Sequence, residues 1–492
     1  MIQKSAALET VWQDWQKYCA LPRDDTILRV VTSLRQNYPD HTVTVAEEKA
    51  GILDYARAGN ATLSRDEDDG RFVAVREYGV ANRRAATKAG KHTDDIRFGT
   101  HYCSWRNKDF IIFTVDWVKD LFGKHKKAYF ILYERNQVAS NESPPKIVDE
   151  LIAEATKWNQ DTREEIWVYD QHQWTKSESL YQSVQQARWD DVVLDPAFKK
   201  ELIADVEGFF DNEAEYKEFA VSWKRGVILH GSPGNGKSIS IKALMRSLAA
   251  RTSPIPTLYV KSLAGCFNEF YSIGQIFEKA RAAAPCLLVF EDLDSLVKEK
   301  VRSFFLNEVD GIADNNGIML IGSTNYLGKL DPSITQRPSR FDRKYPFELP
   351  AHAERTRYAE YWRSKLLKNE RVEFPEGLAA AIADQTDGFS FAYLKEVFVT
   401  SLLSIVAAKR RGANEPEELS EVDGKTNGHV EGKEDPFATV LLWRVVQKQI
   451  QSMKAQMKAA KESAEQAEKA EKQKGDKKTD DHDDEKDEGC GC

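Results

Sequence analysis

The sequence predicts an α/β protein built on a doubly wound parallel sheet, with a small helical lid after it and a mixed α+β region before it. Three observations lead to this fold class. The apolar run 227–229 reads as a buried strand, and it is followed by a glycine-rich loop and a helical pattern over 239–250. Strands and helices then alternate as far as residue 321, which is typical of parallel sheets. After Pro350 only helical patterns are found.

Two regions of different character precede the parallel sheet. Residues 1–64 are expected to be helical, because apolar side chains recur at the spacing of a helix side that faces a core. These side chains are Leu8, Val11, Trp12 and Trp15. Residues 65–185 are expected to be a β-rich domain, because β-branched and aromatic residues concentrate there in short runs. The expected strands are 71–75, 109–115, 129–133 and 165–169, with a helix over 146–158.

Residues 186–349 are expected to form the large domain that contains the parallel sheet. Asp195 followed by Pro196 predicts a helix start, because aspartate accepts hydrogen bonds from the free N–H groups there and proline fits the first helical position. Further strands are expected at 257–260, 286–290 and 317–321, with a helix over 272–283. The carboxyl ends of such strands meet at one edge of the sheet, where ligands bind.

The remainder of the chain is predicted to be helical or polar. Residues 350–411 are expected to form the lid, with helices over 354–367, 377–385 and 391–409. Residues 412–434 contain few large apolar groups and are expected to be a disordered linker. A helix is expected over 435–474, followed by an acidic, disordered tail over 475–492.

A nucleotide site is predicted between the first strand of the sheet and its helix. The loop matches the phosphate-binding pattern G-x-x-x-x-G-K-[S/T] and consists of Gly231, Ser232, Pro233, Gly234, Asn235, Gly236, Lys237 and Ser238. Its glycines let backbone N–H groups at a helix start turn toward phosphate oxygens. Lys237 is expected to reach the β- and γ-phosphates, and Ser238 to offer its hydroxyl to Mg²⁺. The motif therefore predicts MgATP or MgGTP as the ligand.

Carboxylates and an amide follow two later strands. Glu291 and Asp292 come directly after the strand 286–290, with Asp294 close behind. One carboxylate is expected to hold Mg²⁺ through water and the other to orient the attacking water, because phosphoryl transfer is catalysed mainly by positioning and charge stabilisation. If register alone sets the roles, Glu291 takes the metal side and Asp292 the water side. Asn325 ends the next strand, where its amide is expected to contact the γ-phosphate or the water.

Length and composition restrict the class of protein. The chain has 492 residues and a formal net charge of −8, so a nucleic-acid partner is not expected. The longest apolar stretch, 110–122, is interrupted by charged residues, so no integral membrane span is expected. The first twenty residues resemble no targeting signal, and the six cysteines form no disulfide framework. We therefore expect an intracellular protein, with the cytoplasm as the first choice and the mitochondrion and nucleus as open alternatives.

Several stretches between about residues 186 and 405 resemble the AAA ATPase family. They are 276–281 with 284–286, 305–311, 330–343 and 388–390, in addition to the phosphate-binding loop. The resemblance implies that MgATP is hydrolysed to ADP and phosphate. By position, it makes Asn325 the sensor-one residue, and Arg337 and Arg340 the arginine fingers that serve a neighbouring subunit. It also implies a homo-oligomeric ring, a hexamer or heptamer, that remodels or translocates an unknown protein client.

Within this family, the order Glu291-Asp292 is similar to that of the BCS-type branch, the mitochondrial chaperone that translocates the Rieske iron–sulfur protein. The layout of residues 129–174 is similar to the middle domain of that branch. We expect this chain to differ from the branch in lacking its amino-terminal membrane span. The usual aromatic pore motif of the family is also absent. Phe267 and Tyr271 lie near its expected position and either grip a client or pack in the core.

Two alternative interpretations stay open at this point. The reversed order of Glu291 and Asp292 also suits an ATP-binding scaffold or switch with little turnover. The ending Cys490-Gly491-Cys492 resembles the terminus on which small Rab-type GTPases are prenylated. The rest of the chain does not resemble a GTPase body, so two free thiols or a weak metal site are the simpler interpretations.

Overall fold

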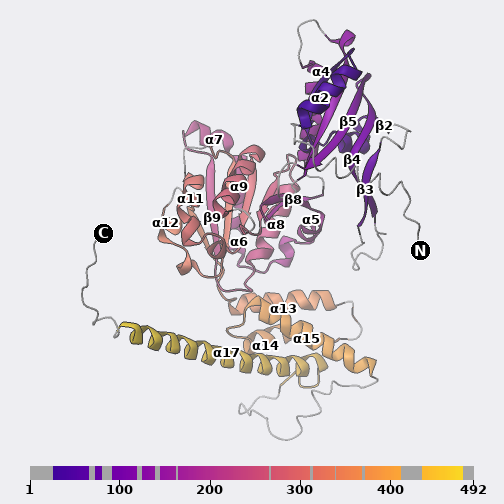
Figure 1. The fold of residues 1–492 in the computed structure, drawn as a ribbon. Helices are drawn as coiled ribbons and strands as arrows, with labels where there is room; N and C mark the ends of the chain where they lie inside the picture. The colour runs from indigo at the N-terminus through magenta and orange to yellow at the C-terminus, as the bar shows by residue number, and fades with distance from the viewer. Residues whose placement is uncertain are drawn as a thin grey trace, which may run out of the picture. The chain divides into compact units, whose positions relative to one another are not determined.

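The computed structural model divides into two compact units, Met1–Arg163 and Glu164–Cys492 (Figure 1). The structure describes residues 26–65, 72–79, 91–118, 125–138, 144–161, 164–264, 268–310, 314–337, 340–367, 369, 372–411 and 435–479. The helical side expected at residues 8–15, the linker 412–434, and the tail from residue 480 onward lie outside these residues.

The first unit is an antiparallel sheet with helices packed against it. The strand order is β1-β6-β5-β4-β2, and β3 also pairs with β4. The strands are β1 (His41–Glu47), β2 (Thr62–Arg65), β3 (Val73–Gly79), β4 (Lys91–Trp105), β5 (Lys108–Val118) and β6 (His125–Glu134). The helices are α2 (Thr26–Asn37), α3 (Ile52–Tyr55) and α4 (Lys146–Gln160), with short helical turns η1 (Glu48–Ala50), η2 (Ala56–Asn60) and η4 (Arg135–Gln137).

The two faces of this sheet are buried by different helices. On one face Leu34 of α2 packs with Phe113 and Phe130. On the other face Leu53 of α3 and Leu151 of α4 join a larger apolar cluster. This first unit is therefore a sheet covered by helices on both sides, consistent with the mixed α+β character that the sequence predicts.

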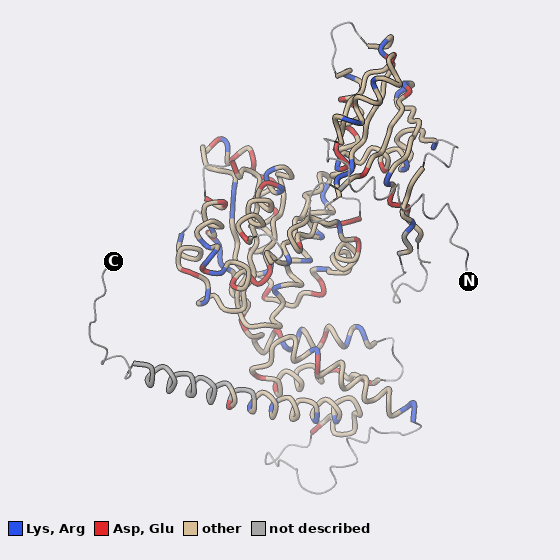
Figure 2. Tube along the Cα trace, viewed as in Figure 1, with Lys and Arg blue, Asp and Glu red and all other residues tan. Residues whose placement is uncertain are grey.

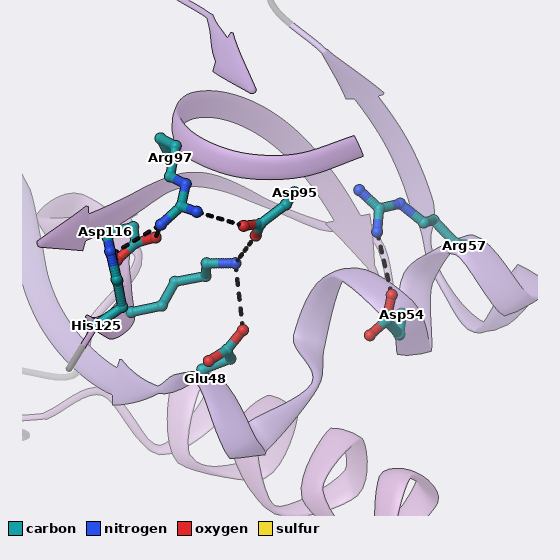
Figure 3. Close-up of polar contacts among 8 residues, drawn as sticks. Glu48, Asp54, Arg57, Asp95, Arg97, Asp116 and His125 are labelled. Atoms are coloured by element: carbon teal, nitrogen blue, oxygen red, sulfur yellow. Dashed lines mark hydrogen bonds and ion pairs between the residues drawn. The ribbon is translucent and has the colours of Figure 1, made fainter. Parts of the chain in front are cut away.

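Residues of opposite charge are interspersed along both units (Figure 2), and in the first unit a row of them crosses β4, β5, β6 and η1 (Figure 3). Lys127 pairs with Glu48 at 3.3 Å and with Asp95 at 2.6 Å. Arg97 pairs with Asp95 at 3.0 Å and with Asp116 at 2.5 Å. His125 pairs with Asp116 at 3.0 Å. The hydrogen bond from Lys127 lowers the pKa of the Asp95 carboxyl. These contacts join three adjacent strands by side-chain ion pairs in addition to their backbone hydrogen bonds.

The expectation that residues 1–64 are helical is wrong for two segments. Strand β1 and all but the last residue of β2 lie in this range, and both strands belong to the antiparallel sheet. Residues 42–45 alternate threonine and valine, and such β-branched side chains favour an extended backbone. The pairing of Val43 with Leu132 of β6 supplies the long-range hydrogen bonds that a local helical pattern cannot reveal.

The second unit contains a seven-stranded sheet with the order β13-β9-β12-β11-β10-β7-β8. All neighbouring strands are parallel except β7 and β8. The strands are β7 (Ile166–Asp170), β8 (Gln173–Ser177), β9 (Lys224–His230), β10 (Thr257–Val260), β11 (Cys286–Phe290), β12 (Ile318–Thr324) and β13 (Arg343–Pro346). This arrangement confirms the parallel sheet that the sequence predicts.

Helices cover both faces of this sheet. The helices and turns are α5 (Glu178–Gln185), η5 (Trp189–Asp191), α6 (Pro196–Asp211), α7 (Glu213–Glu218), α8 (Lys237–Ala249), α9 (Glu269–Ala283), α10 (Leu293–Leu296), α11 (Glu299–Asp310), η6 (Leu327–Lys329) and α12 (Pro332–Thr335). Phe277 of α9 and Phe305 of α11 pack on one face, whereas Leu202 of α6 and Leu244 of α8 pack on the other. The sheet is therefore doubly wound, as predicted.

The boundary between the two main parts of the chain differs from the expected one. The sequence predicts that the large domain begins at residue 186, but β7 and β8 belong to its sheet, because β7 pairs in parallel with β10. The division between compact units falls between Arg163 and Glu164. The strand at 165–169 was expected, but its partner in another part of the chain was not visible in a local pattern.

The helical lid is formed by α13 (His352–Leu366), α14 (Leu378–Gln385) and α15 (Phe391–Arg410), and α17 (Leu441–Thr479) packs along them (Figure 1). Trp443 of α17 is buried in the same apolar cluster as Phe398 of α15. Among the described helices, α15 is the one with the length and hydropathy needed to cross a membrane. Its Leu394 and Val397 lie in the lid core, as expected of a core helix in a folded domain.

Candidate functional site

The glycine-rich loop lies between β9 and α8, at the carboxyl edge of the parallel sheet. Gly231 and Gly234 have φ of +137° and +82°, in the region that favours glycine. A Cβ on Gly231 would lie 2.2 Å from the carbonyl oxygen of Phe347, and one on Gly234 would lie 2.5 Å from the Cβ of Ala392. Glycine is therefore required at both positions for the loop to pass between β13 and the lid.

Lys237 is at the start of α8 and is only 7% exposed. Its Nζ donates hydrogen bonds to the carbonyl oxygens of Gly231 at 2.6 Å and Ser232 at 3.1 Å, and to Oδ1 of Asn325 at 2.8 Å. Burial lowers the pKa of the Lys237 ammonium, and the nearby carboxylates oppose that shift. The structure thus brings the predicted loop lysine and the predicted sensor asparagine into direct contact.

The two carboxylates at the end of β11 make different contacts. Glu291 Oε2 accepts a hydrogen bond from the hydroxyl of Tyr259 at 2.7 Å. Asp292 Oδ1 accepts one from Nδ2 of Asn325 at 3.3 Å, and its backbone is left-handed with φ of +52°. Burial, then the negative charges of Asp294 and Glu291, raise the pKa of Asp292. Asp292 is therefore linked through Asn325 to the loop lysine, whereas Glu291 is held by β10.

Asp294 is anchored to the neighbouring strand rather than to the loop. Its Oδ1 accepts a hydrogen bond from the hydroxyl of Thr324 at 2.7 Å, and Thr324 is fully buried at the end of β12. This bond connects the turn after β11 to β12, which leads directly to Asn325. Sequence reasoning missed Thr324 and Tyr259, because an isolated hydroxyl residue in a strand gives no signal of its partner.

A cavity of about 350 Å³ lies beside the loop, between the lid and the segment before α6. It is lined by Asp191, Val192, Val193, Gly234, Gly236, Ile239, Tyr358, Tyr361, Trp362, Lys365, Phe391, Ala392 and Lys395. The Tyr361 hydroxyl donates to Asp191 Oδ1 at 2.8 Å, and the Ala392 amide donates to the Gly234 carbonyl at 3.1 Å. Aromatic and aliphatic walls beside a phosphate-binding loop suit a nucleotide base.

The residues present fit a nucleotide with its magnesium ion. The loop offers a helix start and a buried lysine to phosphates, and the cavity offers apolar walls to a base. Ser238 is exposed in the first turn of α8, and Glu291 follows the end of β11, two strands along the sheet from β9. Over the described part of the chain, no group of three or more metal-binding side chains is present. Mg²⁺ needs only one or two protein oxygens when phosphates and waters supply the others.

The two predicted finger arginines lie in different environments. Arg337 is exposed, and within the described residues its side chain has no hydrogen bond or ion pair. Arg340 is 7% exposed and donates to Asp310 Oδ2 at 3.1 Å and to the Ser333 carbonyl at 2.6 Å. Neither arginine contacts residues 231–238 of its own chain through a described polar contact.

Of the two aromatic candidates for the pore position, one falls among the described residues. Phe267 lies outside them. Tyr271 is in the first turn of α9, where Asn268 Oδ1 accepts a hydrogen bond from its backbone amide at 2.9 Å, and its ring is half exposed. The adjacent Phe270 instead packs edge-on against Phe304 of α11. Tyr271 is therefore accessible, and Phe270 is part of the packing.

Comparison with known proteins supports the resemblance to the AAA ATPase family. Residues 227–349 match the model of the family described as "ATPase family associated with various cellular activities (AAA)". The chain is 31% identical over 229 residues to the ATP-dependent zinc metalloprotease FtsH of Mesomycoplasma conjunctivae, covering 43% of this chain and 29% of that protein. It is 25% identical over 206 residues to the ATPase histone chaperone abo1 of Schizosaccharomyces pombe, covering 39% of this chain and 17% of that protein.

The chain thus spans less than a third of the length of either relative, and the similarity to each covers less than half of this chain. The matched residues include the loop, the carboxylates at the end of β11, Asn325 and both arginines. They include the polar residues of the site, whereas most of the cavity lining lies outside the matched range. Residues 227–349 of this chain therefore form a domain that matches the AAA family model.

Proposed function

We propose that this protein hydrolyses MgATP and uses the energy to remodel or translocate a protein client. The observation that carries this proposal is the contact between three predicted site residues: Lys237, Asn325 and Asp292 form one hydrogen-bonded chain. They come from the ends of three neighbouring elements, so the fold brings together a phosphate-binding cation, an amide and a carboxylate.

The residues of this site take separate roles in the proposed reaction. When bound, the nucleotide supplies the phosphoryl group that is transferred to water. The loop amides and Lys237 hold the phosphates, and Ser238 and Glu291 hold the magnesium ion. Asp292 orients the attacking water, and Asn325 fixes Asp292 relative to the loop lysine. The cavity between the lid and the segment before α6 holds the base.

Replacement of the loop lysine tests the assignment directly. Lys237→Ala removes the positive charge that meets the β- and γ-phosphates, so we expect loss of both ATP binding and turnover. Binding is measured with a fluorescent ATP analogue and turnover by phosphate release. Lys242→Ala is a matched control, because Lys242 lies on the same helix and donates to Ser183 rather than to the loop. Unchanged nucleotide affinity of Lys237→Ala would refute the site.

We further propose that the protein works as a homo-oligomeric ring, a hexamer or heptamer, inside the cell. Its exposed Arg337 is then available to serve the nucleotide of a neighbouring subunit. The relatives named above are a protease and a histone chaperone, which supports a protein as the client. The order Glu291-Asp292 and the β-rich first unit favour the BCS-type branch of chaperones. Tyr271 is the proposed client contact in the central pore, because it is exposed at the start of α9.

The alternative function is an ATP-binding scaffold or switch with little turnover. It is favoured by the order Glu291-Asp292, which puts an aspartate, one methylene shorter than glutamate, at the position assigned to the water. A steady-state ATPase assay on the intact chain decides between the two functions. If the protein is a scaffold, the intact chain binds ATP but releases phosphate no faster than Asp292→Asn. If it is a motor, the intact chain releases phosphate much faster than that variant.

A further inference from the structure

Helix α11 holds the chain on both sides of Arg337, at residues 331 and 340. Arg302, in the first turn of α11, pairs with Asp331 at the start of α12. Asp310, the last residue of α11, pairs with Arg340 at 3.1 Å. Helix α11 therefore spans the segment and holds it near residues 331 and 340, leaving Arg337 between the two ion pairs.

Arg340 is held on several sides within its own subunit. Its guanidinium donates to the Asp310 carboxylate and to the Ser333 carbonyl, and the side chain is 7% exposed. Its backbone carbonyl oxygen would lie 2.0 Å from a Cβ on Gly226 of β9, so this segment runs directly against the strand that leads to the phosphate-binding loop. The Asp342 amide donates to the Gly226 carbonyl at 3.1 Å and fixes the same contact.

Arg337 differs from Arg340 in each of these respects. Its side chain is exposed, and its backbone carbonyl accepts a hydrogen bond from the amide of Arg340 at 3.2 Å. The position of Arg337 is therefore set by Arg340, while its guanidinium stays available for a ligand outside its own subunit. A guanidinium already committed to a carboxylate and a carbonyl has fewer donors left for a phosphate.

We propose that the two arginines have different functions: Arg337 reaches the neighbouring nucleotide, and Arg340 is a positioning residue that acts through Asp310. This inference rests on the proposed function, because it assigns roles within a ring that hydrolyses ATP. It also makes α11 the connection between two sites. Residues 291–310 run without interruption from the carboxylates at the end of β11, through α10 and α11, to the ion pair that positions the finger.

A double-mutant cycle in the 492-residue chain tests the proposal. Arg337→Ala removes the group that stabilises the transferring phosphoryl, and we expect turnover to fall by about 10³-fold or more. Arg340→Ala and Asp310→Ala each misplace the finger, and we expect each to lower turnover by about 10²-fold. Because both act on one contact, the double variant Arg340→Ala/Asp310→Ala should be no slower than the single variants. Arg340→Lys keeps one charged donor and should restore part of the rate.

A second measurement does not depend on ATP hydrolysis. Hydrogen exchange of residues 330–337 should become faster in Arg340→Ala and Asp310→Ala and stay unchanged in Arg337→Ala. Lys224→Ala is the control for Asp310, because Lys224 binds the other carboxylate oxygen at 3.3 Å and does not contact Arg340. It should leave exchange in residues 330–337 near that of the unmodified chain.

The possible outcomes separate this inference from the proposed function. If the unmodified chain releases no phosphate, the proposed function fails, and the exchange measurement still decides whether Arg340 fixes the segment. If Asp310→Ala keeps full turnover while Arg340→Ala abolishes it, Arg340 itself touches the nucleotide and the inference is overturned. Equal exchange in all variants would also overturn it.

Discussion

At the scale of single residues, the order of Glu291 and Asp292 is the most informative feature of the site. Glu291 is held by the hydroxyl of Tyr259, and Asp292 is joined to Asn325. Asp292, the carboxylate predicted to orient water, thus contacts Asn325, the predicted sensor of the γ-phosphate. The roles that the sequence order predicts are therefore compatible with the contacts.

This arrangement predicts the behaviour of two substitutions. Asp292→Asn removes the charge that polarises water but keeps the shape of the side chain, so ATP should still bind while phosphate release is lost. Glu291→Gln should mainly weaken the binding of Mg²⁺, so that a higher Mg²⁺ concentration is needed for half-maximal turnover. Both are measured by binding of a fluorescent ATP analogue and by phosphate release over a range of Mg²⁺ concentrations. Normal turnover in Asp292→Asn with none in Glu291→Gln would show that the two roles are exchanged.

A second prediction at this scale concerns a buried histidine of the first unit. His101 in β4 is 3% exposed, its Nδ1 has no partner in the described part of the chain, and burial lowers its pKa from 6.5 to about 4. Below pH 6.5 the unfolded chain binds a proton that the folded chain does not, so stability falls as the pH falls from about 6.5 to about 4. A shift of this size corresponds to about 3 kcal/mol.

Hydrogen exchange of β4 and β5 as a function of pH measures this effect. His101→Leu removes the titrating group. Between about pH 6.5 and pH 4 the variant should therefore lose about 3 kcal/mol less stability in these strands than the unmodified chain loses. His92→Gln is the control, since His92 is an exposed residue of the same strand. An identical pH dependence in His101→Leu and the unmodified chain would show that His101 does not cause it.

At the scale of elements, α17 adds a further helix to the core of the lid. Trp443 is 2% exposed, packs in the lid core, and donates through its indole N–H to Asp435 at 2.7 Å. The lid in turn contacts the phosphate-binding loop through Ala392 and Gly234. The packing of α17 is therefore connected through α15 to the nucleotide site.

Removal of the Trp443 side chain tests this connection. Trp443→Ala leaves a large cavity, which typically costs about 3–5 kcal/mol. We expect faster hydrogen exchange in α14 and α15 and weaker ATP binding, because the lid no longer holds its position against the loop. Leu403→Ala is the control, because Leu403 is an exposed residue of α15. If Trp443→Ala loosens α15 but ATP affinity does not change, the lid position does not control binding.

At the scale of the whole molecule, the exposed Arg337 predicts that catalysis depends on assembly. A guanidinium from one subunit that serves the nucleotide of the next makes a head-to-tail contact, and such contacts close into rings when the rotation between subunits allows it. An isolated chain should then hydrolyse ATP slowly, and its specific activity should rise with protein concentration.

Mixing two inactive variants gives the decisive measurement. Arg337→Ala has an intact pocket without a finger, and Lys237→Ala has an intact finger without a pocket. In mixed rings the second chain should restore phosphate release to the first, by an amount set by the fraction of mixed contacts. Mixed rings without any restored activity, or a dilute monomer with the full rate, would show that Arg337 does not act on a neighbour.

The sequence alone determined the features that depend on local chemistry. The loop 231–238 is a contiguous motif, and the strands 257–260 and 286–290 were predicted with the bounds that β10 and β11 have in the structure. A buried parallel strand reads as an uninterrupted apolar run, and a phosphate-binding loop needs glycines and a lysine at fixed spacing. Such patterns need no information from distant residues.

The tertiary structure decided what depends on residues far apart in the chain. It placed β1 and β2 in an antiparallel sheet, added β7 and β8 to the parallel one, and packed α17 against the lid. It also buried Arg340 against Asp310, thirty positions away, and left Arg337 exposed. The physical reason is that strand pairing, helix docking and ion pairs gain free energy from partners that a local pattern does not contain.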